Sequence, residues 1–200
     1  MILALPRKER AVPKYYDFEV SLCEVTPRIW RRLLIPSTAK FSDLHLAIQE
    51  ACGWWNYHLY AFRETPEWRR EGIIAGIPDD EYDEEQNPTP DATKVKLSSY
   101  FSKGDAETCY YLYDFGDDWW HEVILRGVVT TEERFRRRLL GGDRAFPHED
   151  SGGIPGYEDC VRAALHEDDG LDDPEGLRTW FGDWHPEKFE LAAAKKAFDR

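Results

Sequence analysis

Alternating hydrophobic and polar residues near the start of the chain predict a β-hairpin. Tyr16, Phe18, Val20 and Leu22 share one face of a strand over residues 15–25, and Asp17, Glu19 and Ser21 occupy the other. A turn at residues 26–28 leads to a second strand over residues 29–36, which Pro36 ends. We expect these two strands to pair.

Helical spacing follows the hairpin. Leu44, Ala47, Ile48 and Ala51 recur every three or four residues, which predicts a helix over residues 37–52 with one buried stripe. Ser42-Asp43 provides an N-cap signal, and Gly53 ends the helix. An apolar run at residues 57–62 predicts a third strand. This order predicts an α+β fold with a β-grasp-like start: a mainly antiparallel sheet with helices packed on it.

A second hairpin is predicted over residues 110–125. Residues 110–113 and 119–125 are aromatic and apolar, so each favours a strand. The intervening Asp-Phe-Gly-Asp-Asp sequence (114–118) has turn chemistry, because glycine permits positive φ and aspartate accepts bonds from nearby backbone amides.

The C-terminal third begins with a glycine-rich stretch. Residues 141–157 contain five glycines and two prolines, which argues against a regular element and predicts a long functional loop. Helices are expected over residues 158–165, 176–181 and 186–198, as a C-terminal helical segment. We expect residues 1–14 to be a flexible lead-in, and residues 15–200 to be a single domain with a short strand at 73–77 and an acidic surface loop at 78–92.

Charge narrows the choice of partners. The net charge of −13 is concentrated in residues 64–92, with 10 acidic and 2 basic residues, and in residues 149–187, with 12 and 2. Such a field opposes binding to a phosphate backbone. An arginine cluster at residues 134–138 could contact phosphate, but we favour neutralisation of the two acidic segments.

The cellular setting follows from hydropathy and cysteine usage. Apolar runs are too short for a membrane span, and the N-terminus does not resemble a signal peptide. The four cysteines are scattered without a C-x-x-C pair, which favours reduced thiols over a zinc ribbon. We therefore expect a cytoplasmic protein that does not bind membranes; the oligomeric state stays open.

Separated motifs give a specific resemblance. They are Trp30-Arg31-Arg32-Leu33, Leu44-His45, Trp54 with Tyr57-His58-Leu59, the run from Tyr113 to Glu122, and Gly142 to Ala145 followed by Pro147, Glu149-Asp150, Gly152-Gly153 and Gly156-Tyr157. Over residues 15–198 the chain resembles the plasmid pRiA4b ORF-3-like family, whose members are also described as passenger proteins of insertion elements. The resemblance implies an α+β domain linked to mobile elements and implies no known reaction. Many members of that family carry two cysteines at the positions where this chain has Phe146 and Ser151.

The hairpin turn and the glycine-rich loop are the candidate site. We expect both to meet at one end of the sheet, where Asp117, Asp118, His121, Glu149 and Asp150 would form one site. Asp117, His121, His148 and Glu149 are the candidate metal ligands, since carboxylates and imidazole suit a divalent ion. Trp119, Arg31, Arg144 and His58 are the candidate binding surface.

Two functions remain open. The first is a non-enzymatic binding module that recognises a protein or nucleic-acid partner without a required cofactor. The alternative is a divalent-metal-dependent hydrolase or nuclease that uses the same residues. Purely structural roles compete with both, because aspartates in turns commonly cap backbone amides. Kinase and serine-resolvase chemistry are not supported, because the Asp-Phe-Gly at 114–116 comes without the other kinase motifs.

Overall fold

The computed structural model describes residues 11–68, 71–78, 88–102 and 107–199. In chain order its elements are β1 (Lys14–Leu22), β2 (Trp30–Pro36), α1 (Phe41–Cys52), β3 (Tyr60–Arg63), β4 (Ile73–Gly76), α2 (Ser98–Phe101), β5 (Thr108–Tyr113), β6 (Trp119–Thr130), β7 (Arg138–Asp143), α3 (Gly153–Ala164), α4 (Pro174–Phe181) and α5 (Leu191–Phe198). Most of the predicted lead-in (1–10) and of the acidic loop (79–87) lies outside the described residues.

The strands form one antiparallel sheet in the described part of the chain. Its seven strands run in the order β4-β3-β5-β6-β1-β2-β7. Both predicted hairpins are confirmed: β1 pairs with β2, and β5 pairs with β6. Helices pack on this sheet, so the predicted α+β class is confirmed.

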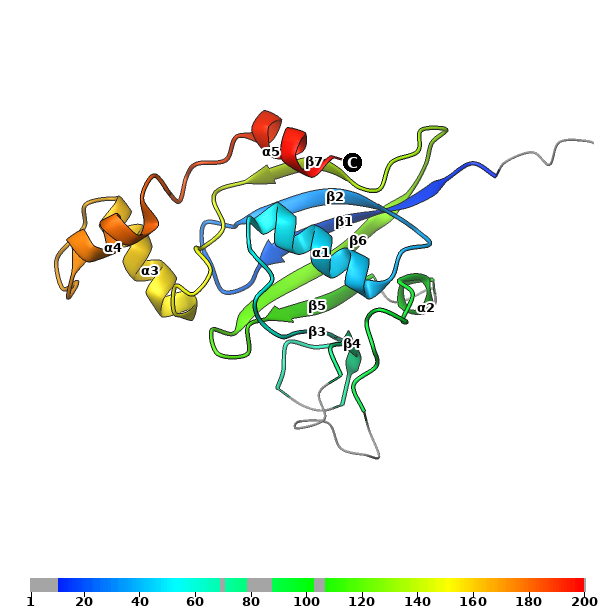
Figure 1. Cartoon of the computed structure of the whole chain (residues 1–200), viewed down its shortest axis with the longest axis horizontal. Coiled ribbons are helices and arrows are strands. Elements are labelled where there is room, and N and C mark those ends of the chain that lie inside the picture. Colours follow the sequence, from blue (N-terminus) through cyan, green and yellow to red (C-terminus); the bar gives the residue numbers. More distant parts are fainter. Residues whose placement is uncertain (1–10, 69–70, 79–87, 103–106, 200) are drawn as a thin grey trace, which may run out of the picture.

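Helix α1 crosses one face of the sheet (Figure 1). Leu44, Ala47 and Ile48 of the predicted stripe are buried against the sheet. The predicted N-cap is wrong: Lys40 is the capping position, and Asp43 accepts a bond from the Lys40 N–H at 2.8 Å. Gly53 ends the helix in the left-handed conformation, as predicted.

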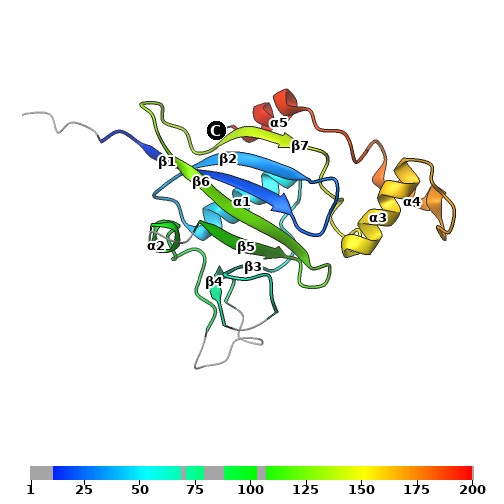
Figure 2. The same cartoon turned by 180° about the vertical axis from the view of Figure 1, so that it is seen from behind.

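The opposite face of the sheet has no helix over it in Figure 2. The polar residues of β1 point that way and are buried under arginine side chains. Arg32 donates to both carboxylate oxygens of Asp17 at 2.9 and 2.7 Å, and Glu19 pairs with Arg28 and Arg126 at 2.8 and 2.9 Å. Long arginine stems thus cover the predicted polar face of the strand.

The hydrophobic core lies between α1 and the sheet. Its largest fully buried side chains include Trp119, Tyr111, Tyr113, Phe18 and Phe62. A smaller cluster of Cys160, Ala163 and Phe181 joins α3 to α4, which lie together beyond one end of the sheet (Figure 1).

The glycine-rich stretch contains regular structure, contrary to the prediction. Strand β7 runs through Gly141 and Gly142, because these residues pair with Arg32 and Arg31 of β2. Helix α3 begins at Gly153 rather than near Tyr157, since Pro155 sits in its first turn, where its missing N–H costs no helical hydrogen bond. Only residues 144–152 remain as a loop.

Within the described residues, none of the helices has both the length and the apolar character that crossing a membrane requires.

Candidate functional site

Three loops meet at one end of the sheet. They are residues 53–59 after α1, the β5–β6 turn at residues 114–118, and residues 144–152 after β7. We call this place the junction. The predicted approach of the hairpin turn to the glycine-rich loop is confirmed, because Asp117 Oδ2 accepts a hydrogen bond from the Gly152 N–H at 2.9 Å.

Tyr113, the last residue of β5, connects the sheet to two loops of the junction. Its hydroxyl donates to Glu149 Oε1 and accepts the backbone N–H of Tyr57 at 3.0 Å. Burial is the main cause that raises the pKa of this phenol, and the hydrogen bond to Glu149 raises it further. The hydroxyl therefore stays protonated at neutral pH. One side chain from the sheet therefore fixes two of the three loops.

Trp54 and Glu149 tie the same two loops together. The Trp54 indole stacks on Tyr113 with ring centres 5.1 Å apart, and its N–H donates to the carbonyl of Pro147 at 2.9 Å. The second oxygen of Glu149 accepts the backbone N–H of Trp55 at 2.7 Å. Glu149 is thus occupied on both oxygens, which makes it a positioning group in this structure.

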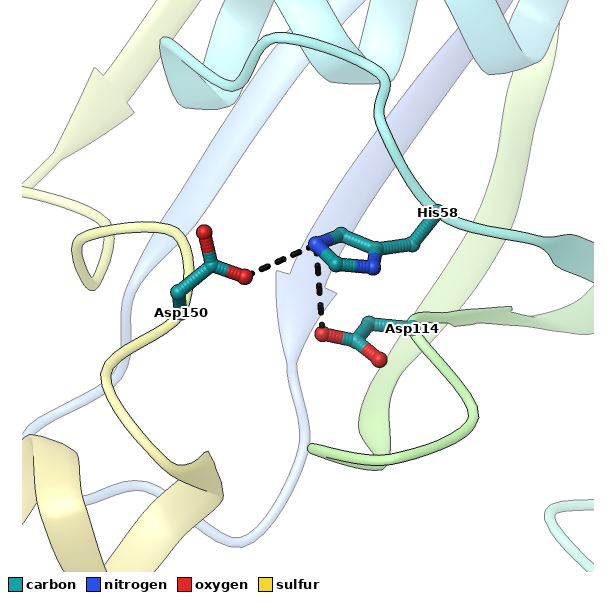
Figure 3. A group of neighbouring side chains, drawn as sticks. All are labelled: His58, Asp114 and Asp150. Carbon is teal, nitrogen blue, oxygen red and sulfur yellow. Dashed lines mark hydrogen bonds and ion pairs between the residues drawn. The ribbon is translucent and has the colours of Figure 1, made fainter.

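His58, Asp114 and Asp150 face one another, each from a different loop (Figure 3). His58 Nε2 lies 2.8 Å from Asp150 Oδ1 and 3.6 Å from Asp114 Oδ2. One nitrogen and two carboxylate oxygens therefore lie within 4.8 Å of one another.

An aromatic hollow of about 340 Å³ opens beside these residues. Its exposed aromatic side chains are Trp55 and Tyr57, both 70% exposed, and Trp180 of α4, 47% exposed. Glu149 and Asp150 also line it. The hollow thus combines aromatic faces with negative charge.

The predicted role of His121 as a site residue and metal ligand is wrong. Its ring is fully buried in the core, and Nδ1 lies 3.0 Å from the carbonyl of Trp119. Burial lowers its pKa to about 4, so the ring is neutral at physiological pH. The metal set of Asp117, His121, His148 and Glu149 therefore cannot assemble around this imidazole. Asp118 is exposed at the turn, with a φ of 58°.

Trp119 is also misplaced by the prediction. It is 0% exposed and packs against Trp54, while its neighbour Trp120 is partly exposed and lies 6.2 Å from Trp68. Alternation along β6 explains both errors, because Trp119, His121 and Val123 share the inward face.

The two arginines predicted on the binding surface are buried. Arg31 is 4% exposed; its guanidinium lies 3.9 Å from the centre of the Phe189 ring and donates to the carbonyls of Ala51 and Asp143. Arg144 is 6% exposed and pairs with Glu187. Both act within the fold. His58 alone of the predicted surface set is partly exposed at the junction.

The predicted site lacked Asp114 and the aromatic residues of the hollow. Asp114 accepts the Gly116 N–H at 3.0 Å, as expected of an aspartate in a turn. His148, a predicted metal ligand, is exposed; its ring lies 5.1 Å from that of Trp180, and it does not belong to the group of His58, Asp114 and Asp150. The sequence offered one usable signal for the hollow, the adjacent Trp54 and Trp55, but no local pattern connects them to Trp180.

The antiparallel sheet and the helix that crosses it define an α+β protein. The chain belongs to the plasmid pRiA4b ORF-3-like protein family, whose model matches residues 14–193. This family has no established function.

Two similar proteins place the chain further. It is 35% identical over 145 residues to the uncharacterized protein y4hQ of Sinorhizobium fredii, covering 72% of this chain and 70% of that protein. It also resembles the crystal structure of MM3350, a protein of unknown function from Methanosarcina mazei Go1, with a TM-score of 0.75 and 33% identity, covering 92% of this chain and 98% of the other.

Proposed function

We propose that this protein is a binding module that recognises a basic segment of a partner protein. The aromatic hollow at the junction would hold one lysine or arginine side chain of that segment. The observation that carries the proposal is the pairing of three exposed aromatic residues with two carboxylates around one hollow.

Aromatic faces attract cations through their ring quadrupole. Such contacts are worth about 0.5–2 kcal/mol each, the larger values applying where water is excluded. Trp55 and Tyr57 support each other, because their rings meet edge to face at 5.9 Å. Large exposed aromatics gathered at a concave site favour recognition over a role in the core.

Charge favours a protein partner over a nucleic acid. The chain carries a net charge of −13, and the residues that line the hollow in the described part of the chain include neither lysine nor arginine. A phosphate backbone would be repelled there. A lysine or arginine side chain would instead complement Glu149 and Asp150.

The arginine cluster at residues 134–138 gives nucleic acid little support. Arg137 pairs with Glu50, and Arg138 pairs with Glu133 at 2.7 Å. Glu50 and Glu133 lie outside the two acidic segments. These two arginines therefore do not neutralise those segments, contrary to the expectation. The metal-dependent hydrolase, our alternative, loses its predicted ligand His121 to the core.

A cytoplasmic location and a link to mobile elements complete the proposal. The four cysteines are free thiols, which fits a reducing compartment. The family name supports the second point through its plasmid origin.

The test is a binding titration with short lysine-rich and arginine-rich peptides, using the full chain. Trp180→Ala and Trp55→Ala should each weaken binding by about tenfold, which corresponds to the loss of one aromatic contact. Trp68→Ala is the matched control, because Trp68 is 53% exposed and does not line the hollow. The proposal is wrong if the wild-type chain binds neither peptide, or if all three variants bind the peptides with the same affinity.

A further inference from the structure

The strongest unassigned feature is the cluster of His58, Asp114 and Asp150. The three side chains come from the loop after α1, the β5–β6 turn and the loop after β7, and they converge on one point (Figure 3). Two carboxylates and one imidazole supply the oxygen and nitrogen atoms that divalent transition metals bind.

Asp114 is held in place by its own turn. This residue is 8% exposed, and its Oδ1 accepts the backbone N–H groups of Gly116 and Asp117 at 3.0 and 3.4 Å. Its Oδ2 faces His58 Nε2 at 3.6 Å, an ion-pair distance longer than a hydrogen bond. The fold thus directs one carboxylate oxygen at the imidazole, where a cation would contact both groups.

The spacing is close to what one ion requires. Bonds to nitrogen or carboxylate oxygen are about 2.0–2.2 Å long, so two ligands of one ion lie about 3–4 Å apart. The separations from His58 Nε2, 2.8 and 3.6 Å, fall near this range, and all three atoms lie within 4.8 Å of one another. The Asp150 side chain is 61% exposed and is free to rotate by the small amount needed.

We propose that His58, Asp114 and Asp150 bind one divalent transition-metal ion, of which Mn²⁺ and Zn²⁺ are suitable examples. The ion would replace the direct contacts of His58 with the two carboxylates and balance their charge. Three protein ligands beside partly exposed side chains leave positions for water, as in metal sites that remain open to further ligands. The ion would also tie the three loops of the junction together.

This inference goes beyond the peptide-binding proposal. The two sites share Asp150, but Asp114 does not line the hollow, and Trp180 does not belong to the cluster. Metal binding can therefore be measured without peptide, and failure of one proposal leaves the other standing.

The test is isothermal titration of the chelator-treated full chain with MnCl₂ and with ZnCl₂. One ion should bind per chain, and Asp114→Asn and His58→Gln should each weaken binding by at least about tenfold. Asparagine keeps one oxygen for the turn amides, so Asp114→Asn tests the ligand rather than the turn. Circular dichroism checks that both variants fold.

The matched control is Asp118→Asn, which removes a carboxylate from the same turn outside the cluster. Asparagine tolerates the left-handed conformation of this residue, whose φ is 58°. Binding should be unchanged in this variant. The proposal is overturned if the wild-type chain binds neither ion, or if Asp114→Asn and His58→Gln bind as tightly as the wild type.

Discussion

Two histidines show how burial decides the chemistry of a single residue. His121 is fully buried, and burial lowers its pKa to about 4. Burial also lowers the pKa of His45 to about 4, although its hydrogen bond to Asn56 opposes the shift. In the unfolded chain both rings return to a pKa near 6.5. Between about pH 6.5 and pH 4 the unfolded state therefore binds protons that the folded state does not bind.

We therefore predict that the protein loses stability as the pH falls below about 6.5. The stabilising effect of a lowered histidine pKa is complete above the unfolded value and declines towards the folded value. At about pH 5 each ring should cost about 2 kcal/mol relative to about pH 7.5. Urea unfolding at the two pH values measures this loss. A His45→Gln, His121→Gln double variant should show a flatter dependence; an unchanged slope would contradict the assignment.

Arg31 gives a prediction on the opposite kind of residue, a buried charge. Arg31→Ala removes the group that lies between Phe146 and Phe189 and leaves backbone carbonyls without a donor. We expect a loss of about 3 kcal/mol in the free energy of unfolding. Arg28→Ala is the control: its side chain is 46% exposed, and its partner Glu19 keeps the ion pair with Arg126 at 2.9 Å, so about 1 kcal/mol is expected. Equal losses in the two variants would count against a structural role for Arg31.

At the scale of elements, the start of α3 is docked onto the β5–β6 turn. Gly153 has a φ of 69°, and a Cβ atom there would lie 2.7 Å from the carbonyl oxygen of Asp117. Glycine is therefore required twice, once by the backbone conformation and once by the close approach. The hydrogen bond from the Gly152 N–H to Asp117 Oδ2 joins the start of the helix to the same turn.

Gly153→Ala should destabilise the protein more than Gly53→Ala. Gly53 is also left-handed, with a φ of 81°, but a Cβ there would meet nothing within 4 Å. We expect about 1 kcal/mol for the conformation alone at Gly53, and about 3 kcal/mol at Gly153, where the contact adds to it. Urea unfolding measures both, and hydrogen exchange should show faster opening of α3 in Gly153→Ala alone. Similar losses would mean that the docking contact is unimportant.

The elements that the sequence predicted well are those whose pattern is local. The alternation in β1 and the helical stripe of α1 each point to one buried face without reference to the rest of the chain. Strand β7 was not predicted because its glycines are required by their packing against β2, which is distant in the sequence. A Cβ at Gly142 would lie 2.7 Å from Arg31 Cδ, so the reason for that glycine is on β2.

The candidate site divides in the same way. The meeting of the hairpin turn and the glycine-rich loop was predictable, since both were expected at one end of the sheet. The inward direction of the His121 side chain was also predictable, because His121 follows the buried Trp119 by two residues on β6. The grouping of His58 with Asp114 and Asp150 could not be predicted. Each side chain comes from a different loop, and only the folded arrangement of the three loops brings them together.

At the scale of the whole molecule, charge and hollow lie together. Glu149, Asp150 and Trp180 belong to residues 149–187, which contain 12 acidic and 2 basic residues. A basic segment would therefore meet an attractive field before its side chain reaches the hollow. Such a field mainly accelerates association, whereas contacts inside a hollow mainly slow dissociation.

Salt should thus separate the two contributions to peptide binding. Raising NaCl from about 50 to about 300 mM should slow association of a lysine-rich peptide by about tenfold, because screening shortens the reach of the acidic segment. Trp180→Ala should instead speed dissociation and leave the salt dependence intact, since it removes an aromatic contact and no charge. Stopped-flow tryptophan fluorescence of the full chain measures both rates, with a glutamine-substituted peptide as the uncharged control. An association rate that ignores salt would show that the net charge of −13 plays no part in recognition.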